Sequence, residues 1–433
     1  MREDGTSHHI ADPGKEARSR AGIPIVPAFD GFRAFAILGV VAIHLIQISG
    51  LGNTVDDSVG RLLWGSFGRA VEALFIISGF VVYLPTAARG GEFGRFVPYA
   101  IRRGARLLPA YWLIIAFSIL LLAVFTVYSP VLRDQVLAVP DLGNIALNLT
   151  TLAVPASMLS SDVSVGMGID PPLWTLSSEL IFYLVLPLVA VLFFRRPILA
   201  LALSAAITVA WMLAFDNLQS LTEDLGMSLA SGEQLRLGFA SEQQFPTWAF
   251  SFALGMCGAL AWVRLTQSRI PAKVMERRAG LAAAASLAVA IVTGFILGGD
   301  AAFTREQILG SMVFSVALAV LMVALTLCPP GWQRPFTASR VRQLGDISYG
   351  IYLSHYVFIT LAVSAFALPA DGTVGDFLLL ELIVLPPTVL YGYLSARFLE
   401  QPVRRWARKY GAATRTKPDG AGPSNPGSRG PAG

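Results

Sequence analysis

The chain has 433 residues, of which 54% are hydrophobic and 14% are charged, and its formal net charge at pH 7 is +5. A soluble domain carries roughly a quarter charged residues, so this composition excludes an ordinary soluble protein. The positive charge does not indicate binding to nucleic acid, because the basic residues follow the loops between apolar segments. We therefore expect an integral membrane protein surrounded by the lipid bilayer.

Ten apolar segments are long enough to cross a bilayer and are separated by polar breaks. They lie near residues 32–50, 63–85, 107–128, 176–194, 197–215, 246–264, 279–297, 307–327, 345–368 and 377–398. This pattern predicts an all-α fold, a polytopic membrane bundle of about ten transmembrane helices over residues 28–409. The polar residues 1–27 contain no signal peptide and, together with residues 410–433, are expected to form disordered cytosolic ends.

Lys and Arg are concentrated in the loops on one side of the predicted bundle. Both termini and the loops on their side hold 26 of the 33 basic residues, and three others lie within apolar segments. The opposite loops hold the remaining four, Arg61, Arg133, Arg236 and Arg305. Because cytoplasmic loops carry an excess of Lys and Arg, we expect a multi-pass plasma-membrane protein with both termini in the cytosol. Residues 129–175 and 216–245 would then face outward.

The first apolar segment contains two ionisable residues, Arg33 and His44. Such residues are costly in hydrocarbon and often mark a functional site. Their 11-residue separation is about three helical turns, which puts them on one helix face and ~16 Å apart along the axis. Arg33 would lie near the cytosolic boundary, where a snorkelling anchor is the simpler interpretation. His44 would lie near mid-membrane, neutral and available as a base; a structural, hydrogen-bonded histidine is the alternative.

The second segment adds the charged Glu72 and a small pair formed by Ser78 and the glycine after it. A small helix surface lets another backbone or a ligand approach closely, and by itself this pair favours helix packing over chemistry. The third segment is preceded by Arg102, Arg103 and Arg106. Arg forks match phosphate oxygens, so these residues could hold a phosphorylated substrate, or they could be an ordinary positive-inside anchor.

Two further segments carry ionisable residues at membrane depth. The fourth begins with Ser177, Ser178 and Glu179, where the two serines could cap a helix and Glu179 would be favourable in its first turn. The ninth carries Asp346 and, nine residues later, His355. The two cysteines lack metal-ligand spacing, so no metal site is expected.

These motifs resemble those of the acyltransferase 3 family of integral membrane O-acyltransferases, over about residues 28–408. The stretches similar to the family's signatures are, in chain order, FDGFRAFAILGVVAIH, VEALFIISGF, RRGARLLPAYW, LWTLSSELIFYL, LGDISYGIYLSHY and FLEQPVRR. Glu72 replaces the family's usual Asp, and only the first carboxylate of its frequent Glu-Glu-Gln run is present, as Glu179. The sequence shows no counterpart of the extracytoplasmic hydrolase-like domain that many relatives carry, which makes a peptidoglycan acceptor a weaker expectation.

The resemblance implies transfer of an acyl group, often acetyl, from cytosolic acyl-CoA to a hydroxyl group. The acceptor would be a sugar-containing molecule, such as a cell-envelope glycan, a glycolipid or a macrolide-like metabolite. His44 would be the catalytic base, Arg33 would hold or polarise the reacting end, and Arg33 or Ser78 would steady the oxyanion. Acyl-CoA is expected as donor substrate, with no permanently bound cofactor. The remaining candidates are Glu179 in the catalytic group and, for the phosphates of the donor, Arg102, Arg103 and Arg106.

Two other classes of protein stay open from the sequence. A transporter or flippase of an amphipathic or glycolipid substrate, and a structural membrane scaffold, would also have ten spans and buried charges. A transporter would not explain the register of Arg33 and His44 combined with a cytosolic basic cluster. Within the acyltransferase hypothesis, direct transfer and a covalent acyl-histidine intermediate are both compatible with the residues.

Overall fold

The computed structural model describes residues 24–54, 57–224, 230–298, 305–366 and 371–412. Most of the predicted terminal segments, residues 1–23 and 413–433, therefore lies outside the described residues. The described part is almost entirely helical, and its only sheet is a two-residue antiparallel pairing of β1 (Val127–Tyr128) with β2 (Val136–Leu137). The predicted all-α fold is confirmed.

Ten helical segments of the described chain are long and apolar enough to span a membrane, as the sequence predicted. They are formed by α1 (Ala28–Ser49), α3 (Asp57–Phe67) with α4 (Ala70–Ala88), α5 (Phe96–Val124), α8 (Trp174–Arg195), α9 (Pro197–Asp216), α11 (Ser231–Glu242) with α12 (Phe245–Thr266), α13 (Ala272–Leu297), α14 (Arg305–Leu327), α16 (Ser339–Phe366) and α17 (Val374–Ser395). The shorter elements are α2 (Leu51–Thr54), α6 (Leu142–Leu149), α7 (Ala153–Ser157), α10 (Leu218–Asp224), α15 (Pro330–Thr337), α18 (Gln401–Ala412), the 3₁₀ turns η1 (Val165–Gly168) and η2 (Pro171–Leu173), and the π-helical turn η3 (Ala396–Glu400).

Helix α8 begins earlier than the sequence indicated. It starts at Trp174, directly after the two prolines of η2, so Ser177 and Ser178 lie inside the helix. Proline favours the start of a helical segment because its φ is preset and it lacks an N–H that would be unsatisfied there, and α8 has no side-chain cap at Leu173. The capping interpretation of these two serines was wrong. Ser178 instead donates a hydrogen bond of 3.1 Å to the carbonyl oxygen of Gln243.

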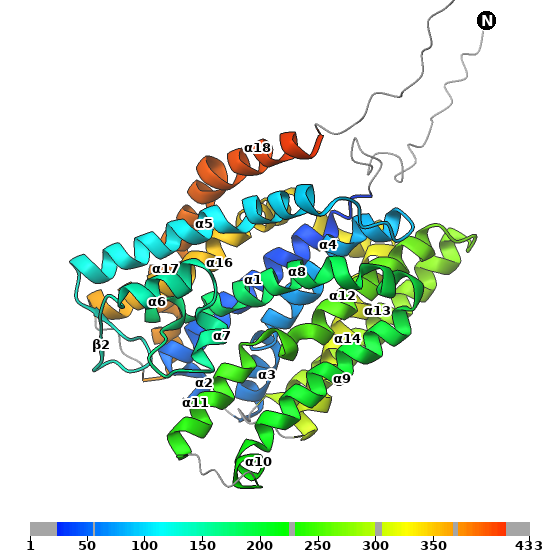
Figure 1. Cartoon of the computed structure of the whole chain (residues 1–433). Helices are drawn as coiled ribbons and strands as arrows, with labels where there is room; N and C mark the ends of the chain where they lie inside the picture. Colours follow the sequence, from blue (N-terminus) through cyan, green and yellow to red (C-terminus); the bar gives the residue numbers. More distant parts are fainter. Residues whose placement is uncertain (1–23, 55–56, 225–229, 299–304, 367–370, 413–433) are drawn as a thin grey trace, which may run out of the picture.

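Helix α4 lies in the interior of the bundle, where it packs against α1, α8, α12 and α14 (Figure 1). Its closest approach is to α12: a Cβ added at Gly79 would lie 2.2 Å from the carbonyl oxygen of Phe252, and one added at Gly255 would lie 2.1 Å from that of Ile76. The small surface predicted in the second segment is therefore a helix-packing surface at Gly79. The same close packing fixes the direction in which the neighbouring Ser78 points.

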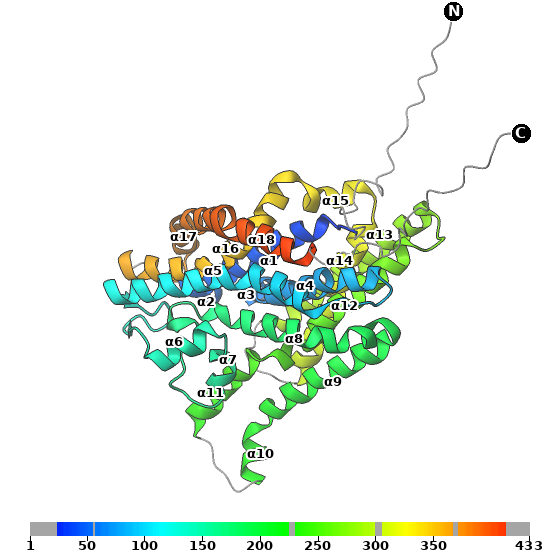
Figure 2. The same cartoon turned by 45° about the horizontal axis from the view of Figure 1, so that its top comes forward.

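The bundle separates polar and apolar surfaces as a membrane protein requires. Helices α15 and α18 lie on one side of it, and α10 and α11 lie on the opposite side (Figure 2). Between these sides, α9 and α13 expose large apolar side chains such as Ile198 and Leu281. Lipid tails can surround such helices without leaving backbone polar groups unsatisfied. Polar side chains at membrane depth are instead turned toward the interior.

Candidate active site

A cavity of about 90 Å³ lies between α1, α4, α5, α8 and α16. Its volume is well above the ~10–15 Å³ that a single water needs. Four of the seven predicted site residues line it, Arg33, Ser78, Arg106 and Glu179. The other polar side chains around it are Thr175, Tyr183, Ser348, Tyr349 and Tyr352. Residues from motifs far apart in the sequence thus share one polar space inside the bundle.

Ser78 and Glu179 form the polar centre of this cavity. The Ser78 hydroxyl donates a hydrogen bond of 2.9 Å to Oε1 of Glu179, and the Tyr183 hydroxyl donates to the same oxygen. Tyr183 lies one turn after Glu179 on α8, which explains how both reach one point. Because a serine hydroxyl has a single proton, Ser78 cannot donate to a substrate oxyanion in this arrangement. The cluster fixes the Glu179 carboxylate in place.

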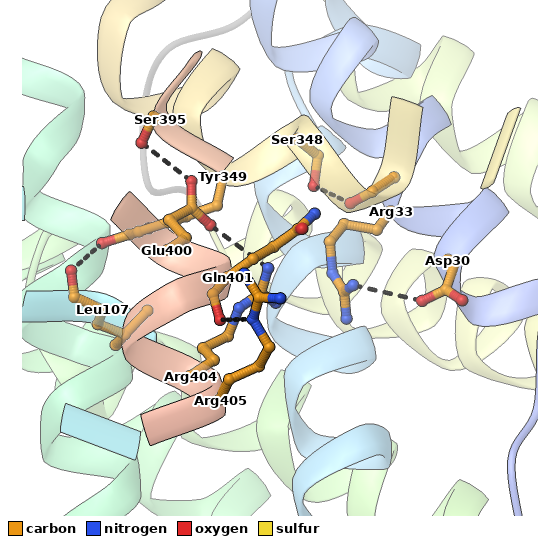
Figure 3. A network of polar contacts seen from close by, with 11 residues as sticks. Asp30, Arg33, Leu107, Ser348, Tyr349, Ser395, Glu400, Gln401, Arg404 and Arg405 are labelled. Atoms are coloured by element: carbon orange, nitrogen blue, oxygen red, sulfur yellow. Dashed lines mark hydrogen bonds and ion pairs between the residues drawn. The ribbon is translucent and has the colours of Figure 1, made fainter. Parts of the chain in front are cut away.

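Arg33 enters the cavity from the N-terminal end of α1. One of its terminal nitrogens, Nη1, lies 3.6 Å from Oδ1 of Asp30, one turn earlier on α1. Nε of Arg342 in α16 lies 3.8 Å from the other oxygen of Asp30. Figure 3 shows Arg33 directed toward Asp30 beside the turn of α16 that carries Ser348. Asp30 therefore compensates two cations at the end of the cavity nearest the basic loops.

The three arginines before the third span do not form a single patch. Arg106 lines the cavity, and Arg102 is exposed. The Arg103 guanidinium lies over the rings of Tyr99 and Tyr183, 5.8 and 5.5 Å from their centroids. Arg102 and Arg103 lie four and three positions before Arg106, so helical spacing alone would bring both near Arg106. The side chains separate because the rings of Tyr99 and Tyr183 hold the guanidinium of Arg103 and Arg102 is turned to the surface. Only Arg106 is directed into the predicted site.

The closing motif places α18 beside the same cavity. Glu400 accepts a 3.1 Å hydrogen bond from Ser395, and its other oxygen lies 3.9 Å from Nη2 of Arg404 on α18 (Figure 3). The Tyr349 hydroxyl, which lines the cavity, donates a 2.8 Å hydrogen bond to the Leu107 carbonyl of α5. Helix α18 in turn packs against α5. The end of the cavity near Arg106 is therefore lined by α5 and α16, and α18 supports it by packing against α5.

His44 forms a pair with His355. Nδ1 of His44 lies 2.9 Å from Nε2 of His355, and the ring centroids are 5.1 Å apart. His355 is completely buried, and its Nδ1 lies 2.6 Å from the carbonyl oxygen of Tyr352. The sequence placed His355 at membrane depth but gave it no role, because nothing in the spacing brings residues 311 positions apart together.

The hydrogen-bond partners of this pair assign its protons. A carbonyl oxygen can only accept, so Nδ1 of His355 carries the hydrogen that binds Tyr352. In neutral His355 the other nitrogen, Nε2, is then an acceptor and takes the Nδ1 hydrogen of His44. This leaves Nε2 of His44 with a free lone pair. The chain Tyr352–His355–His44 therefore holds His44 in the tautomer that a base or nucleophile needs.

His44 and Arg33 do not face the same cavity, although they share α1. His44 is absent from the described lining of the cavity, which Arg33 and Ile37 of α1 both contact. Tyr352 connects the two places: its hydroxyl is at the cavity, donating 2.5 Å to the Pro172 carbonyl and lying 2.5 Å from the Thr175 hydroxyl, while its own carbonyl holds His355. The site thus consists of the cavity and of the His44–His355 pair, which begins one turn of α16 after the cavity residue Tyr352.

Asp170 is a buried carboxylate that the sequence reasoning missed. It follows Gly166, Met167 and Gly168, which all have positive φ and fold the chain back on itself. Both carboxylate oxygens are buried, and none of the described residues donates a hydrogen bond to them. Burial raises the pKa of the Asp170 carboxyl well above its usual range. The neutral form is therefore favoured.

The chain on both sides of Asp170 is bonded to α16. Thr360 donates to the Ile169 carbonyl at 3.1 Å, and Tyr352 donates to that of Pro172. Asp170 therefore lies against the turns of α16 that carry His355.

Comparison with known proteins places this architecture in a family. A family described as an acyltransferase domain matches residues 26–397, which covers the first nine spans and most of the tenth. The chain belongs to the acyltransferase 3 family. Its transmembrane bundle is therefore an acyltransferase domain. No solved structure matches the chain.

Two of the relatives that match the chain are bacterial proteins named as O-acetyltransferases. The chain is 26% identical over 394 residues to "Putative peptidoglycan O-acetyltransferase YrhL" of Bacillus subtilis, covering 88% of this chain and 55% of the relative. It is 24% identical over 399 residues to "Peptidoglycan O-acetyltransferase OatA" of Listeria monocytogenes, covering 88% of this chain and 56% of the relative. The chain thus spans little more than half the length of these relatives.

The raised pKa of the buried Asp170 carboxyl predicts the direction in which the stability of the protein changes with pH. Its folded-state pKa lies above the unfolded value, so the stability of the wild type is fully present below about pH 4 and falls as pH rises toward the folded pKa. Asp170→Asn removes this titration. We expect the difference in melting temperature, variant minus wild type, to increase between pH 5 and pH 8 in detergent.

Asp141 provides the control with the opposite sign. It caps α6, and hydrogen bonds from the side chain and backbone of Asn144 lower its pKa. Stability from Asp141 is therefore present above its unfolded pKa and is lost as the pH falls through the folded one. Asp141→Asn should destabilise the protein most at neutral pH. A melting-temperature difference for Asp170→Asn that does not change with pH would contradict an unpaired buried carboxyl.

Proposed function

We propose that this protein is a membrane O-acyltransferase that moves an acyl group, most simply acetyl, from acyl-CoA to a hydroxyl of a sugar-containing acceptor. The observation that carries the proposal is the hydrogen-bond chain Tyr352–His355–His44, which presents Nε2 of His44 as a base at membrane depth. Membership of the acyltransferase 3 family supports the reaction type. The relatives' names support an acetyl group and an envelope glycan, although the chain matches only part of those proteins.

In the direct route, the acceptor hydroxyl attacks the thioester carbonyl while Nε2 of His44 takes its proton. A C–O bond forms and the C–S bond breaks, and the leaving thiolate takes the proton from the imidazolium, so the products are the ester and CoA. In the covalent route, Nε2 attacks the thioester carbonyl, the C–S bond breaks and the CoA thiolate leaves. The acceptor hydroxyl then attacks the acyl-imidazole, the C–N bond breaks, and the hydroxyl proton ends on the thiolate, so the products are again the ester and CoA. The hydrogen bond to His355 orients the imidazole in both routes.

The cavity residues complete the proposal on the donor side. Arg106 would bind the phosphates of CoA, and Arg33, which lines the same cavity beside Asp30, would add positive charge for the anionic donor. Because Arg33 does not share a cavity with His44, the role of Arg33 would be binding of the donor and not stabilisation of the oxyanion at His44. Glu179, fixed by Ser78 and Tyr183, would hold the lining of the cavity in a constant position. The acyl group would pass Tyr352 to reach His44. Arg102 and Arg103 would contribute to attraction of the anionic donor without direct contact.

A test of the base uses purified protein in detergent, supplied with acetyl-CoA and an N-acetylglucosamine tetramer as acceptor, and measures release of CoA. His44→Ala should lower the rate by ~10²–10⁴-fold, the usual contribution of a general base. His355→Gln should cause a smaller loss and alter the pH profile of the rate, because it acts through the tautomer of His44. Tyr356→Phe is the matched control: it keeps the ring that lies edge-on to His44, 5.2 Å between centroids, and should stay close to wild type.

The outcome also separates the classes of function. A transporter or scaffold would release no CoA from acetyl-CoA in any variant. If wild type releases CoA and His44→Ala retains a rate within a few-fold of it, His44 is a structural histidine.

The separation of Arg106 from Arg103 predicts unequal effects on binding of CoA. Arg106→Ala should weaken binding by roughly 10–150-fold, since a charge-assisted hydrogen bond contributes ~1.5–3 kcal/mol. Added salt should weaken the wild-type complex more than that of the variant. Arg103→Ala, one turn away on α5, should have a smaller effect because its guanidinium lies over Tyr99 and Tyr183. Titration calorimetry with CoA measures both, and equal effects would refute the assignment.

The proposed orientation has both termini and the donor-binding end of the cavity in the cytosol of a plasma-membrane protein. It rests on the distribution of basic residues between the two sets of loops. Single cysteines introduced at Asp141 and at Gly90, in a background without Cys257 and Cys328, provide the test in intact cells. An impermeant thiol reagent should label the first and not the second. The reverse pattern would invert the topology.

A further inference from the structure

A second polar cavity, of about 200 Å³, lies on the other side of α4 between α9, α11, α12 and α14. Its lining comes from the halves of α9 and α14 that are farthest from the basic loops. In the proposed orientation it therefore occupies the outer half of the bundle, whereas the first cavity reaches in from the cytosolic half. Neither the family assignment nor the proposed reaction uses it.

The two cavities are separated by an aromatic wall. Phe75 lines the first cavity and Trp248 lines the second, with their ring centroids 5.1 Å apart. Trp174 stacks on Trp248 at 5.5 Å and contacts Phe75 at 6.1 Å. The outer cavity consequently has an indole on the wall that faces the catalytic cavity.

The two carboxylates of the outer cavity, Glu72 and Glu242, differ in their hydrogen-bond partners. Glu72 is 3% exposed and fully engaged: Arg69 Nη1 donates to one oxygen at 3.1 Å, and Ser315 donates to the other at 2.6 Å. Glu242 lines the same cavity, and none of the described residues donates a hydrogen bond to its carboxylate. Hydroxyl side chains of α9, α12 and α14 also line the cavity: Thr208, Thr247 and Ser315 donate to protein acceptors, whereas Ser251 and Ser311 form no hydrogen bond among the described residues. The cavity therefore offers a carboxylate that accepts no hydrogen bond from the described residues, close to the Arg69–Glu72 ion pair whose arginine also attracts it.

We propose that this outer cavity is a carbohydrate subsite that binds one ring of the glycan acceptor. A carboxylate that accepts from sugar hydroxyls, the Ser251 and Ser311 hydroxyls that can donate or accept, and an indole beside them match the mixed polar and apolar surface of a pyranose ring. A bare anion would meet two carboxylates, and an apolar ligand would leave Glu242 desolvated without a partner. The inference rests on the proposed function for the identity of the glycan as acceptor. The subsite anchors the chain while another ring carries the hydroxyl that reacts.

The experiment compares an N-acetylglucosamine tetramer with the monosaccharide as acceptors for purified protein supplied with acetyl-CoA. Glu242→Gln keeps the size of the side chain but removes the charge, so it should raise KM for the tetramer by about tenfold or more with little change in kcat. The monosaccharide, which gains nothing from a remote subsite, should show little change. Glu233→Gln, on the same helix α11 but paired with Arg236 outside the cavity, is the matched control.

A second measurement tests binding in the outer cavity without any enzymatic reaction. Ser311→Cys places a thiol on its lining, in a background without the two native cysteines. The tetramer should slow labelling of this cysteine by a soluble thiol reagent, and Glu242→Gln should abolish that protection. An unchanged KM for the tetramer in Glu242→Gln, or no protection of the cysteine in the wild-type cavity, would overturn the subsite. Failure of wild type to release CoA from acetyl-CoA would instead refute the proposed reaction, and protection would still report on the cavity.

Discussion

The direction of donors and acceptors along the hydrogen-bond chain Tyr352–His355–His44 determines which nitrogen of His44 is left as an acceptor. The carbonyl of Tyr352 can only accept, and this single fact orders the protons of His355 and then of His44. Tyr352 is itself fixed by its hydroxyl, which binds the start of α8 at Pro172 and Thr175. Helices α1, α8 and α16 must therefore keep their relative positions for His44 to present a free Nε2.

Helix α4 gives the bundle its two polar spaces. It approaches α12 so closely at Gly79 that no side chain fits between them, and this contact fixes its rotation. Ser78 is then directed to Glu179 on one side, and Glu72 is directed to Ser315 on the other. Because a helix turns about 100° per residue, residues six positions apart lie on different faces. One rigid helix thus forms a wall of both the catalytic cavity and the outer cavity.

The sequence predicted the spans and many of the site residues, but not their partners. Apolar length and polar breaks were sufficient for ten helices, because hydrocarbon permits few other structures. The pairing of His44 with His355 depends on how α1 packs against α16, which no local pattern encodes. The Arg102 to Arg106 stretch was treated as one cluster, but the Arg103 guanidinium lies over Tyr99 and Tyr183 and Arg102 is exposed, which helical spacing does not reveal. The capping interpretation of Ser177 failed because the prolines before it begin the helix.

The cost of burying ionisable groups explains which of them are structural and which are available for chemistry. Arg33 has Asp30, and Glu72 has Arg69 and Ser315, so these charges are compensated inside the protein. Glu179 receives two hydroxyl donors and is held in place. Nε2 of His44 and the carboxylate of Glu242 differ, because no described residue donates a hydrogen bond to either of them; Asp170 shares this property but lines neither cavity. Such acceptors persist at the expense of stability, and a substrate that supplies a hydroxyl proton removes that cost at both places.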